Sequence, residues 1–361
     1  MAVRLFDPQT PRAPLRGELA AALGRVLDDG RYILGPEVEA FEREFAAWLG
    51  TEHVVGVANG TEAITIALRA LGVGPGDEVV VPSFTFYASA EAIPPTGATP
   101  VFCDVDPATF VATPDAVRAV LTPRTKAVIL VHLFGNVAPV AEVEALGVPV
   151  LEDAAQATGS RLGGELTGTL GTIATFSFYP SKNLGGIGDG GAVSTGDAAL
   201  AERVRTLRFH GSPDKETFTE IGYNSRLDEL QAAALRVQLP HVHAWCEGRR
   251  AAGRAYAAAG MGDHARLPVP AAGADPAWNL YVVRHPRPEE LAAALRDQGI
   301  GARTYYSGPA HRQPALADLG RDAVLPGTEE AARTHLALPM GAALTEAQVG
   351  EVVAAARAAG L

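Results

Sequence analysis

Short, almost uninterrupted apolar runs alternate along this chain with stretches of helical periodicity. The runs are EVVV (78–81), AVILV (127–131), VPVL (148–151) and TIATFSFY (172–179). Strands that are apolar on both faces are typical of parallel sheets covered by helices on both sides, so these runs favour an α/β fold. Segments 37–49 and 61–71 repeat apolar residues at spacings of three and four, which predicts covering helices.

The pattern changes after about residue 240. Segment 262–277 is rich in Pro, Gly and Ala, which predicts a loop. It is followed by strand-like segments at 279–284 and 302–307 and by helix-like segments at 288–299 and 345–360. We therefore predict a large domain over residues 1–240 and a smaller α+β domain over 241–361.

The overall charge is acidic, with a formal net charge of -11 at pH 7. Nucleic-acid binders usually carry a basic stripe, and this sequence has none, so we expect no nucleic-acid partner. Three arginines at helical spacing are interpreted as a solvated face: Arg203, Arg205 and Arg208. The N-terminal segment lacks an apolar signal region and no run approaches ~18 apolar residues, which predicts a cytoplasmic protein without a membrane partner.

The sequence predicts no metal site. Cys103 and Cys246 lie far apart and lack the spacing of zinc ligands, so we expect reduced thiols. His241 and His243 have no further ligands near them in the sequence and are interpreted as surface residues.

Two segments at strand ends carry candidate ligand-binding groups. In ANGTEAI (58–64), Gly60 and Thr61 stand where a helix begins. Free N–H groups and the helix dipole favour a phosphate there, although a plain N-cap explains the same residues. In VPVLEDAAQATGS (148–160), a strand ends in Asp153, where α/β sheets bind ligands. This carboxylate either pairs with a cationic ring nitrogen or caps the next helix. Gln156, three residues further on, would then lie on the same helical face as Asp153.

Lys182 lies between an aromatic strand and a glycine-dense turn in FSFYPSKNLGGIGDGGAV (176–193). Burial there would lower the pKa of the lysine and favour an imine with an aldehyde, and the alternative is a surface lysine beside a flexible loop. The glycine spacing matches neither the dinucleotide fingerprint nor a Walker loop, which disfavours a nucleotide-binding dehydrogenase. Further along, Asn224 and Arg226 precede a predicted helix.

Taken in this order, these segments resemble the DegT-type (DegT/DnrJ/StrS) sugar aminotransferases, which are pyridoxal-phosphate enzymes of fold-type I. The resemblance runs from RYILGPEVEAFEREFA (31–46) through VVVPSFTFYASAEAI (79–93), VFCDVDPATF (101–110) and VHLFGN (131–136) to YYSGPAHRQPAL (305–316). It implies a three-layer α/β/α aminotransferase fold with a mostly parallel mixed sheet. It also implies a homodimer with shared active sites.

The resemblance assigns roles to matching residues. Lys182 would bind pyridoxal 5'-phosphate covalently and transfer protons, and Asp153 would pair with the protonated ring nitrogen. The other implied cofactor contacts are Gly60, Thr61, Phe86, Gln156, Ser177 and, from the neighbouring subunit, Asn224. The implied substrate contacts are Tyr32, Tyr179, Tyr306 and His311.

The implied reaction transfers an amino group from an amino acid, L-glutamate, to a nucleotide-linked keto sugar, with pyridoxamine phosphate as the aminated cofactor. Segment 210–231 looks closer to members that act on 3-keto sugars than to those that act on 4-keto sugars. Lys182 argues against the related dehydratases, which have His at this position. Two alternatives stay open: an inosose (cyclitol) aminotransferase, and a non-catalytic cofactor- or sugar-binding sensor on the same fold, which the retained Lys182, Asp153 and Gln156 disfavour.

Overall fold

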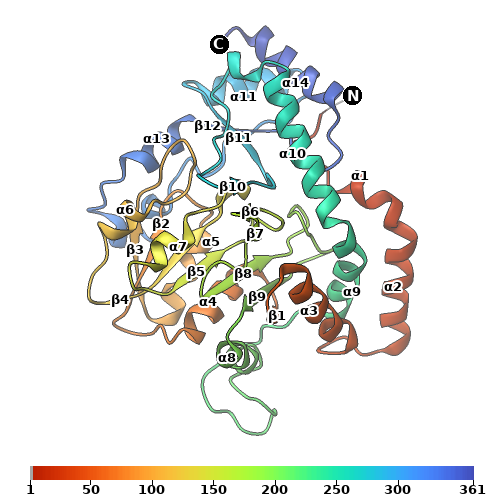
Figure 1. The fold of residues 1–361 in the computed structure, drawn as a ribbon, viewed down its shortest axis with the longest axis vertical. Helices are drawn as coiled ribbons and strands as arrows, with labels where there is room; N and C mark the ends of the chain where they lie inside the picture. Colours follow the sequence, from red (N-terminus) through yellow and green to blue (C-terminus); the bar gives the residue numbers. More distant parts are fainter. Residues whose placement is uncertain (1–2) are drawn as a thin grey trace.

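A seven-stranded sheet forms the centre of the computed structural model, which describes residues 3–361 (Figure 1). Its strands are β1 (His53–Val57), β2 (Glu78–Pro82), β3 (Thr99–Cys103), β4 (Thr125–Val131), β5 (Val150–Asp153), β8 (Ile173–Ser177) and β9 (Gly191–Thr195). They lie in the order β1–β9–β8–β5–β4–β2–β3. The five strands from β8 to β3 are parallel, and β9 is antiparallel to both of its neighbours. The predicted mostly parallel mixed sheet is confirmed.

Helices cover both faces of this sheet, as the apolar runs predict. α4 (Gly60–Ala70) and α8 (Ala198–Arg208) cover one face. The other face is covered by α3 (Pro36–Leu49) and α9 (Glu229–Gln238) near β1 and by α6 (Pro114–Arg118) and α7 (Val140–Glu144) near β5. Val79 and Val81 of β2 pack in the cluster beneath α4, whereas Val80 packs beneath α7. Alternate residues of a strand point to opposite faces, so a strand buried on both sides is apolar throughout.

A second hydrophobic cluster fills the C-terminal part of the chain. Its elements are α10 (Val242–Ala258), β11 (Tyr281–Arg284), α11 (Pro288–Asp297), β12 (His335–Leu338) and α14 (Glu346–Ala359). α13 (Pro326–Thr334) instead packs through Ala331 in the cluster beneath α4. β11 and β12 form an antiparallel pair. α10 joins the two clusters, because Cys246 packs in the cluster beneath α3 and Tyr256 in the C-terminal one. The boundary after residue 240 stays a prediction.

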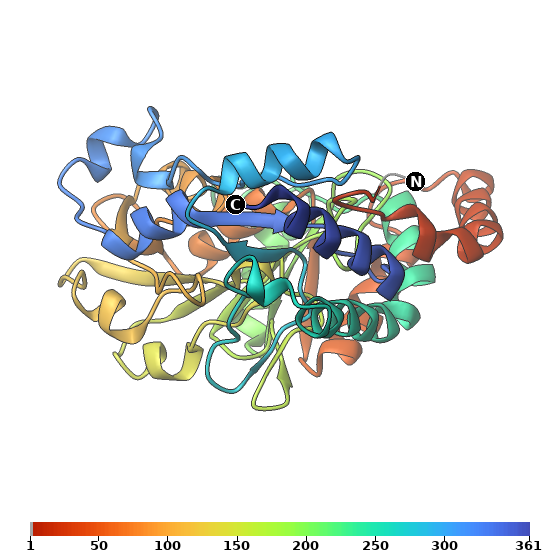
Figure 2. The same cartoon turned by 90° about the horizontal axis from the view of Figure 1, so that it is seen from above.

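The remaining elements are short or peripheral. They are α1 (Gln9–Arg12), α2 (Arg16–Asp29), α5 (Ala88–Glu91), β6 (Arg161–Leu162), β7 (Glu165–Leu166), β10 (Ala274–Asp275) and α12 (Ala317–Gly320). α2 lies outside α9, at the right edge of Figure 1. Seen from above in Figure 2, α11 and α14 lie toward the viewer, and the C-terminal end of the chain lies on this side of the molecule.

Two local predictions are wrong. Segment 302–307 forms no strand beyond a single bridge between Arg303 and Ala337, because Tyr306 adopts a positive φ of 63° that ends the extended conformation. Arg208 does not lie on a solvated face. It is buried, and its guanidinium donates to the Glu42 carboxylate at 2.5 Å and to the Gly56 carbonyl at 2.7 Å. Glu42 comes from α3, a partner that helical spacing within 203–208 does not reveal.

The metal and membrane predictions concern the described part of the chain only. Over residues 3–361, no group of three or more His, Cys, Asp or Glu side chains is arranged to hold a metal ion. Cys103 and Cys246 are both free thiols, and both are buried. None of the helices within these residues is long and apolar enough to cross a membrane.

Candidate active site

The C-terminal end of β5 places a carboxylate at the edge of the central sheet. Asp153 is 5% exposed, and its Oδ2 atom accepts a hydrogen bond of 2.7 Å from the Ser89 hydroxyl. Its Oδ1 atom accepts from the Ala155 backbone N–H at 3.2 Å. The Thr85 hydroxyl lies 2.9 Å from the Ser89 hydroxyl, so a buried chain of hydroxyl groups orients the carboxylate. A carboxylate accepts about four hydrogen bonds, which leaves acceptor positions on Asp153 for a cationic partner.

The preceding carboxylate, Glu152, is fully engaged inside the protein. It is 0% exposed and bonds to His132 Nε2 at 2.9 Å. It also accepts backbone N–H groups from the loop before β8, at Gly168, Leu170 and Gly171. Nδ1 of His132 accepts from the Ala138 N–H, so its Nε2 carries the proton that is donated to Glu152. Glu152 therefore has a structural role and is not available to a ligand.

Lys182 lies half-buried on the loop after β8. Burial lowers the pKa of Lys182 to about 8, and the nearby Asp153 carboxylate acts in the opposite direction. The loop around it is held by Arg12, whose guanidinium donates to the carbonyls of Pro180 at 3.0 Å and Gly185 at 2.8 Å. Lys182 thus has a larger neutral fraction near pH 7 than an ordinary lysine, and the neutral amine is the nucleophile that attacks an aldehyde.

The start of α4 meets the end of β8, as expected for an anion-binding site. Asn59 caps the helix by accepting the Glu62 N–H at 2.9 Å. A Cβ atom on Gly60 would lie 2.8 Å from the Ser177 Cβ, so only glycine allows this close approach. The first N–H groups of a helix have no partner within it, and they lie here beside the Ser177 hydroxyl. The N-cap and the phosphate interpretations of this segment are therefore compatible.

Gln156 links the strand end to the C-terminal part of the chain. Its Oε1 accepts the Phe134 N–H at 2.9 Å, and this identifies its Nε2 as the donor to the Tyr306 hydroxyl at 3.1 Å. The Tyr306 ring stacks on Phe134, with centroids 5.9 Å apart, and lies 6.0 Å from Phe86. Burial raises the pKa of Tyr306, so its hydroxyl keeps its proton at neutral pH.

One expectation about Gln156 is wrong. Residues 155–159 form turns and not a helix, so Gln156 does not share a helical face with Asp153. The backbone leaves the helical conformation because Gly159 adopts a positive φ of 89° and the Asp153 side chain accepts the Ala155 N–H in a local turn.

The side chains of four other predicted site residues form no direct hydrogen bond with Asp153, Lys182 or Gln156. His311 is buried, and its ring nitrogens lie 2.6 Å from the Ser83 hydroxyl and 3.4 Å from the Glu329 carboxylate. Tyr32 and Tyr179 are 45% and 55% exposed. Asn224 is exposed and accepts a hydrogen bond from Arg226. Their roles toward a substrate or a cofactor stay predictions.

Three residues with clear positions here were not singled out from the sequence. Ser89 and Thr85 lie in the stretch VVVPSFTFYASAEAI, and their hydroxyl groups soon after a buried strand were a usable signal. Arg12 gave no signal, because its acceptors are backbone carbonyls 168 and 173 residues away.

A parallel-sheet core, a lysine of lowered pKa and a buried carboxylate at a strand end suit the class of pyridoxal-phosphate-dependent transferases. The comparison with known families agrees, since the profile of the DegT/DnrJ/EryC1/StrS aminotransferase family matches residues 15–357. The chain belongs to this family.

Individual relatives span almost the whole chain. A dTDP-3-amino-3,4,6-trideoxy-alpha-D-glucose transaminase of Streptomyces venezuelae is 46% identical, with 97% of this chain and 96% of that protein covered. A pleiotropic regulatory protein of Geobacillus stearothermophilus is 44% identical, with 98% and 97% covered. The crystal structure of S. venezuelae DesV in complex with a ketimine intermediate has a TM-score of 0.95 and 46% identity, with 99% of this chain and 98% of that chain covered.

The residues of this chain fit pyridoxal phosphate, the cofactor of the family. The start of α4 with Ser177 offers N–H and hydroxyl groups suited to a phosphate. Asp153 offers a buried negative charge suited to a protonated ring nitrogen. Lys182 offers an amine of lowered pKa suited to an aldehyde.

The lowered pKa of Lys182 predicts a pH-dependent stability for the cofactor-free protein. Lysine ordinarily titrates near 10.5 and Lys182 near 8, so between these values the unfolded chain binds more protons and stability rises with pH. Lys182→Met removes this partly buried charge. At pH 7 this variant should therefore be more stable than the cofactor-free wild type, and the gain should shrink as the pH rises from about 8 to 10.5.

Urea unfolding of both proteins at pH 7 and pH 10 measures this difference. Lys126→Met, at an exposed position, is the control and should show little gain at either pH. If the gain in the free energy of unfolding of Lys182→Met were the same at both pH values, it would contradict the lowered pKa of Lys182.

Proposed function

We propose that this chain transfers an amino group from L-glutamate to a nucleotide-linked sugar with a keto group at C3. The observation that carries the proposal is the placement of Lys182, with its lowered pKa, near the buried Asp153 in a chain of this family. The nucleotide and the C3 position are supported by the relative named a dTDP-3-amino sugar transaminase, at 46% identity. A cytoplasmic location stays part of the proposal.

Each residue of the site has a distinct part in this reaction. Bound pyridoxal phosphate supplies an aldehyde that accepts the amino group and a ring that takes up negative charge. The Lys182 amine would hold the cofactor and, once released, would move a proton between the α-carbon of the amino donor and the C4′ carbon of the cofactor. Its pKa of about 8 suits both directions of this transfer near neutral pH.

The other residues orient the cofactor and exclude water. The Asp153 carboxylate would pair with the ring nitrogen and favour its protonated form, because an opposite charge nearby stabilises a cation. The Nε2 group of Gln156 donates one hydrogen to Tyr306 and has a second for the ring oxygen. The start of α4 and the Ser177 hydroxyl would bind the phosphate, and the exposed Phe86 would be available to stack on the ring.

A regulatory role is the second candidate, because one relative at 44% identity is named a pleiotropic regulatory protein. A sensor needs cofactor or sugar binding only, whereas this chain also has a lysine whose lowered pKa suits proton transfer.

An inosose acceptor would leave the cofactor site unchanged and alter only the sugar contacts. A panel of nucleotide-linked 3-keto and 4-keto sugars and inososes separates these acceptors.

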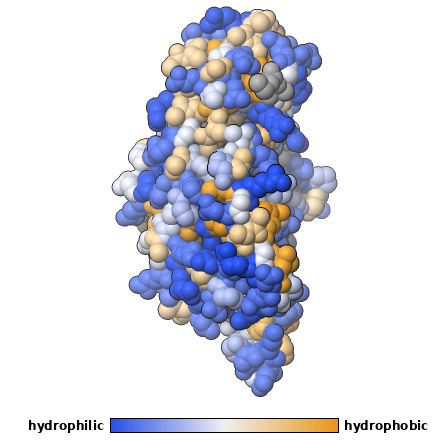
Figure 3. All heavy atoms as spheres, turned by 90° about the vertical axis from the view of Figure 1, so that its right-hand side faces the viewer, coloured by the Kyte–Doolittle hydropathy of each residue, from blue (hydrophilic) through white to orange (hydrophobic). Residues whose placement is uncertain are grey.

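A second copy of the chain is proposed to complete the site. Tyr32, Ile33, Phe86, Tyr179, Ile187, Phe218 and Ile221 are among the large hydrophobic side chains that are exposed in the single chain. Figure 3 shows hydrophobic residues among hydrophilic ones on the side of the molecule that carries α2. The loop between α8 and Asn224 projects from the lower end of the molecule in Figure 1, and Asn224 lies at its base, bridged to Phe209. Its exposed side chain is available to the phosphate of a partner.

Asp153→Asn should cut turnover by roughly 10²–10³-fold while the protein still binds the cofactor, because the charge that favours the protonated ring is lost. Lys182→Ala should remove transaminase turnover altogether. Turnover is measured with L-glutamate and a thymidine diphosphate 3-keto sugar, and Asp28→Asn, at an exposed position, is the control. Near-normal turnover in Asp153→Asn would show that another group serves the ring nitrogen.

A mixing experiment tests the shared site. Alone, Lys182→Ala is expected to be inactive, and Asn224→Asp weakly active because its added charge repels the phosphate. An equal mixture, allowed to exchange subunits, should regain about a quarter of wild-type activity, since half of the dimers are hybrids with one intact site. If the mixture stays as weak as its components, Asn224 does not act across subunits.

A further inference from the structure

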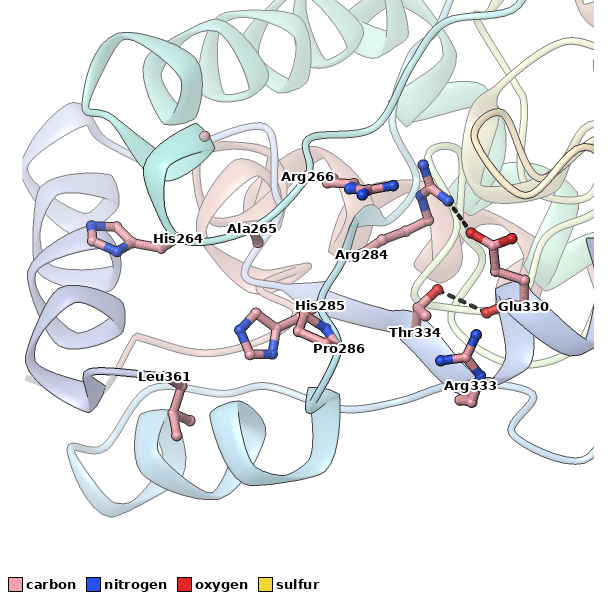
Figure 4. Close-up of a pocket in the computed structure, with 11 residues that line it drawn as sticks. His264, Ala265, Arg266, Arg284, His285, Pro286, Glu330, Arg333, Thr334 and Leu361 are labelled. Carbon is pink, nitrogen blue, oxygen red and sulfur yellow. Dashed lines mark hydrogen bonds and ion pairs between the residues drawn. The ribbon is translucent and has the colours of Figure 1, made fainter.

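A cleft of about 530 Å³ lies in the C-terminal part of the chain (Figure 4). Its walls come from the segment after α10, the end of β11, the end of α13 and the last residue, Leu361. None of the residues assigned to the cofactor or the sugar lines it. Its size lies within the roughly 300–1,000 Å³ of small-molecule sites.

Two arginines stand side by side in this cleft. The backbones of Arg266 and Arg284 pair as an antiparallel bridge, with N–H to carbonyl distances of 2.9 and 2.8 Å in the two directions. Like charges placed directly opposite across such a pair destabilise the fold. Figure 4 shows the Arg266 guanidinium directed toward that of Arg284. Only Arg284 of the two has a carboxylate partner, Glu330, so an anion bound beside Arg266 would reduce the repulsion between the two guanidinium groups.

A third arginine, Arg333, lines the same cleft from α13. Glu330 is the one carboxylate side chain among the lining residues, and it bonds to Arg284 at 2.9 Å. Within residues 3–361, Arg266 and Arg333 form no ion pair, and both are exposed to solvent. The cleft thus has two uncompensated positive charges in a protein whose formal net charge is -11.

We propose that this cleft binds a small molecule that carries a diphosphate. Guanidinium groups bind phosphate oxygens with pairs of parallel hydrogen bonds, and two uncompensated charges match a dianionic group. The cleft extends past the arginines to His285, Ala265 and Leu361, which gives room for an organic group beyond the phosphates.

The stability of an arginine variant distinguishes a ligand-binding role of these arginines from a structural one. Arginines that stabilise the fold would make their loss destabilising. Arginines kept for a ligand repel each other without it, so Arg266→Ser should leave the ligand-free protein at least as stable as the wild type. The ligand should raise the unfolding temperature of the wild type and not of the variant.

Calorimetric titration of the cofactor-loaded protein with thymidine diphosphate tests the proposal. The wild type should show two classes of sites, one at the sugar site and one in the cleft. The double variant Arg266→Ser/Arg333→Ser should keep the first and bind at the second at least about tenfold more weakly, since two charge-assisted contacts disappear. Arg254→Ser is the matched control, because Arg254 is exposed on α10 outside the cleft, and it should bind as the wild type does. Transaminase turnover should be the same in all three proteins.

Pyrophosphate and inorganic phosphate are titrated in parallel. Pyrophosphate should bind in the cleft, and inorganic phosphate more weakly. Equal titration curves for the wild type and the double variant would overturn the proposal. So would equal affinities for phosphate and pyrophosphate, or a double variant that is less stable than the wild type without ligand.

Discussion

The site depends on the two adjacent carboxylates that end β5. Successive residues of a strand point to opposite faces, so Glu152 and Asp153 reach different surroundings. Glu152 is saturated by His132 and by three backbone N–H groups, which hold the loop before β8 against the sheet. A buried carboxylate is costly unless it is hydrogen-bonded, so these donors make the position possible. Asp153 has fewer donors and keeps acceptor positions for a cation.

Lys182 follows β8, whereas Asp153 ends β5. Hydrogen bonds connect the surroundings of both residues to distant segments of the chain. The N-terminal segment bonds to the C-terminal part through the carbonyls of Val3 and Leu5, and it then places Arg12 on the Lys182 loop. From the other side, Tyr306 reaches Gln156. Both links connect the C-terminal part to the cofactor site. Changes in that part can therefore alter the site without touching Lys182.

The sequence predicted the elements whose signal is local. The apolar runs became β2, β4, β5 and β8, and the helical periodicity became α3, α4, α11 and α14. It did not predict features that depend on distant partners. Arg208 is buried because Glu42 lies opposite it, and Ser89 orients Asp153 across 64 residues. The extended pattern of 302–307 was overridden by the positive φ of Tyr306, which turns its hydroxyl toward Gln156.

The central claim is that Lys182 and Asp153 operate bound pyridoxal phosphate as an amino-group carrier. The absorption spectrum of the purified, cofactor-loaded protein, taken before and after addition of L-glutamate without a sugar, tests it most directly. The account predicts that the visible band of the lysine-bound cofactor gives way to the near-ultraviolet band of the aminated cofactor, because the first half of the reaction proceeds without the acceptor. A protein that shows no visible band after incubation with pyridoxal phosphate would contradict the account.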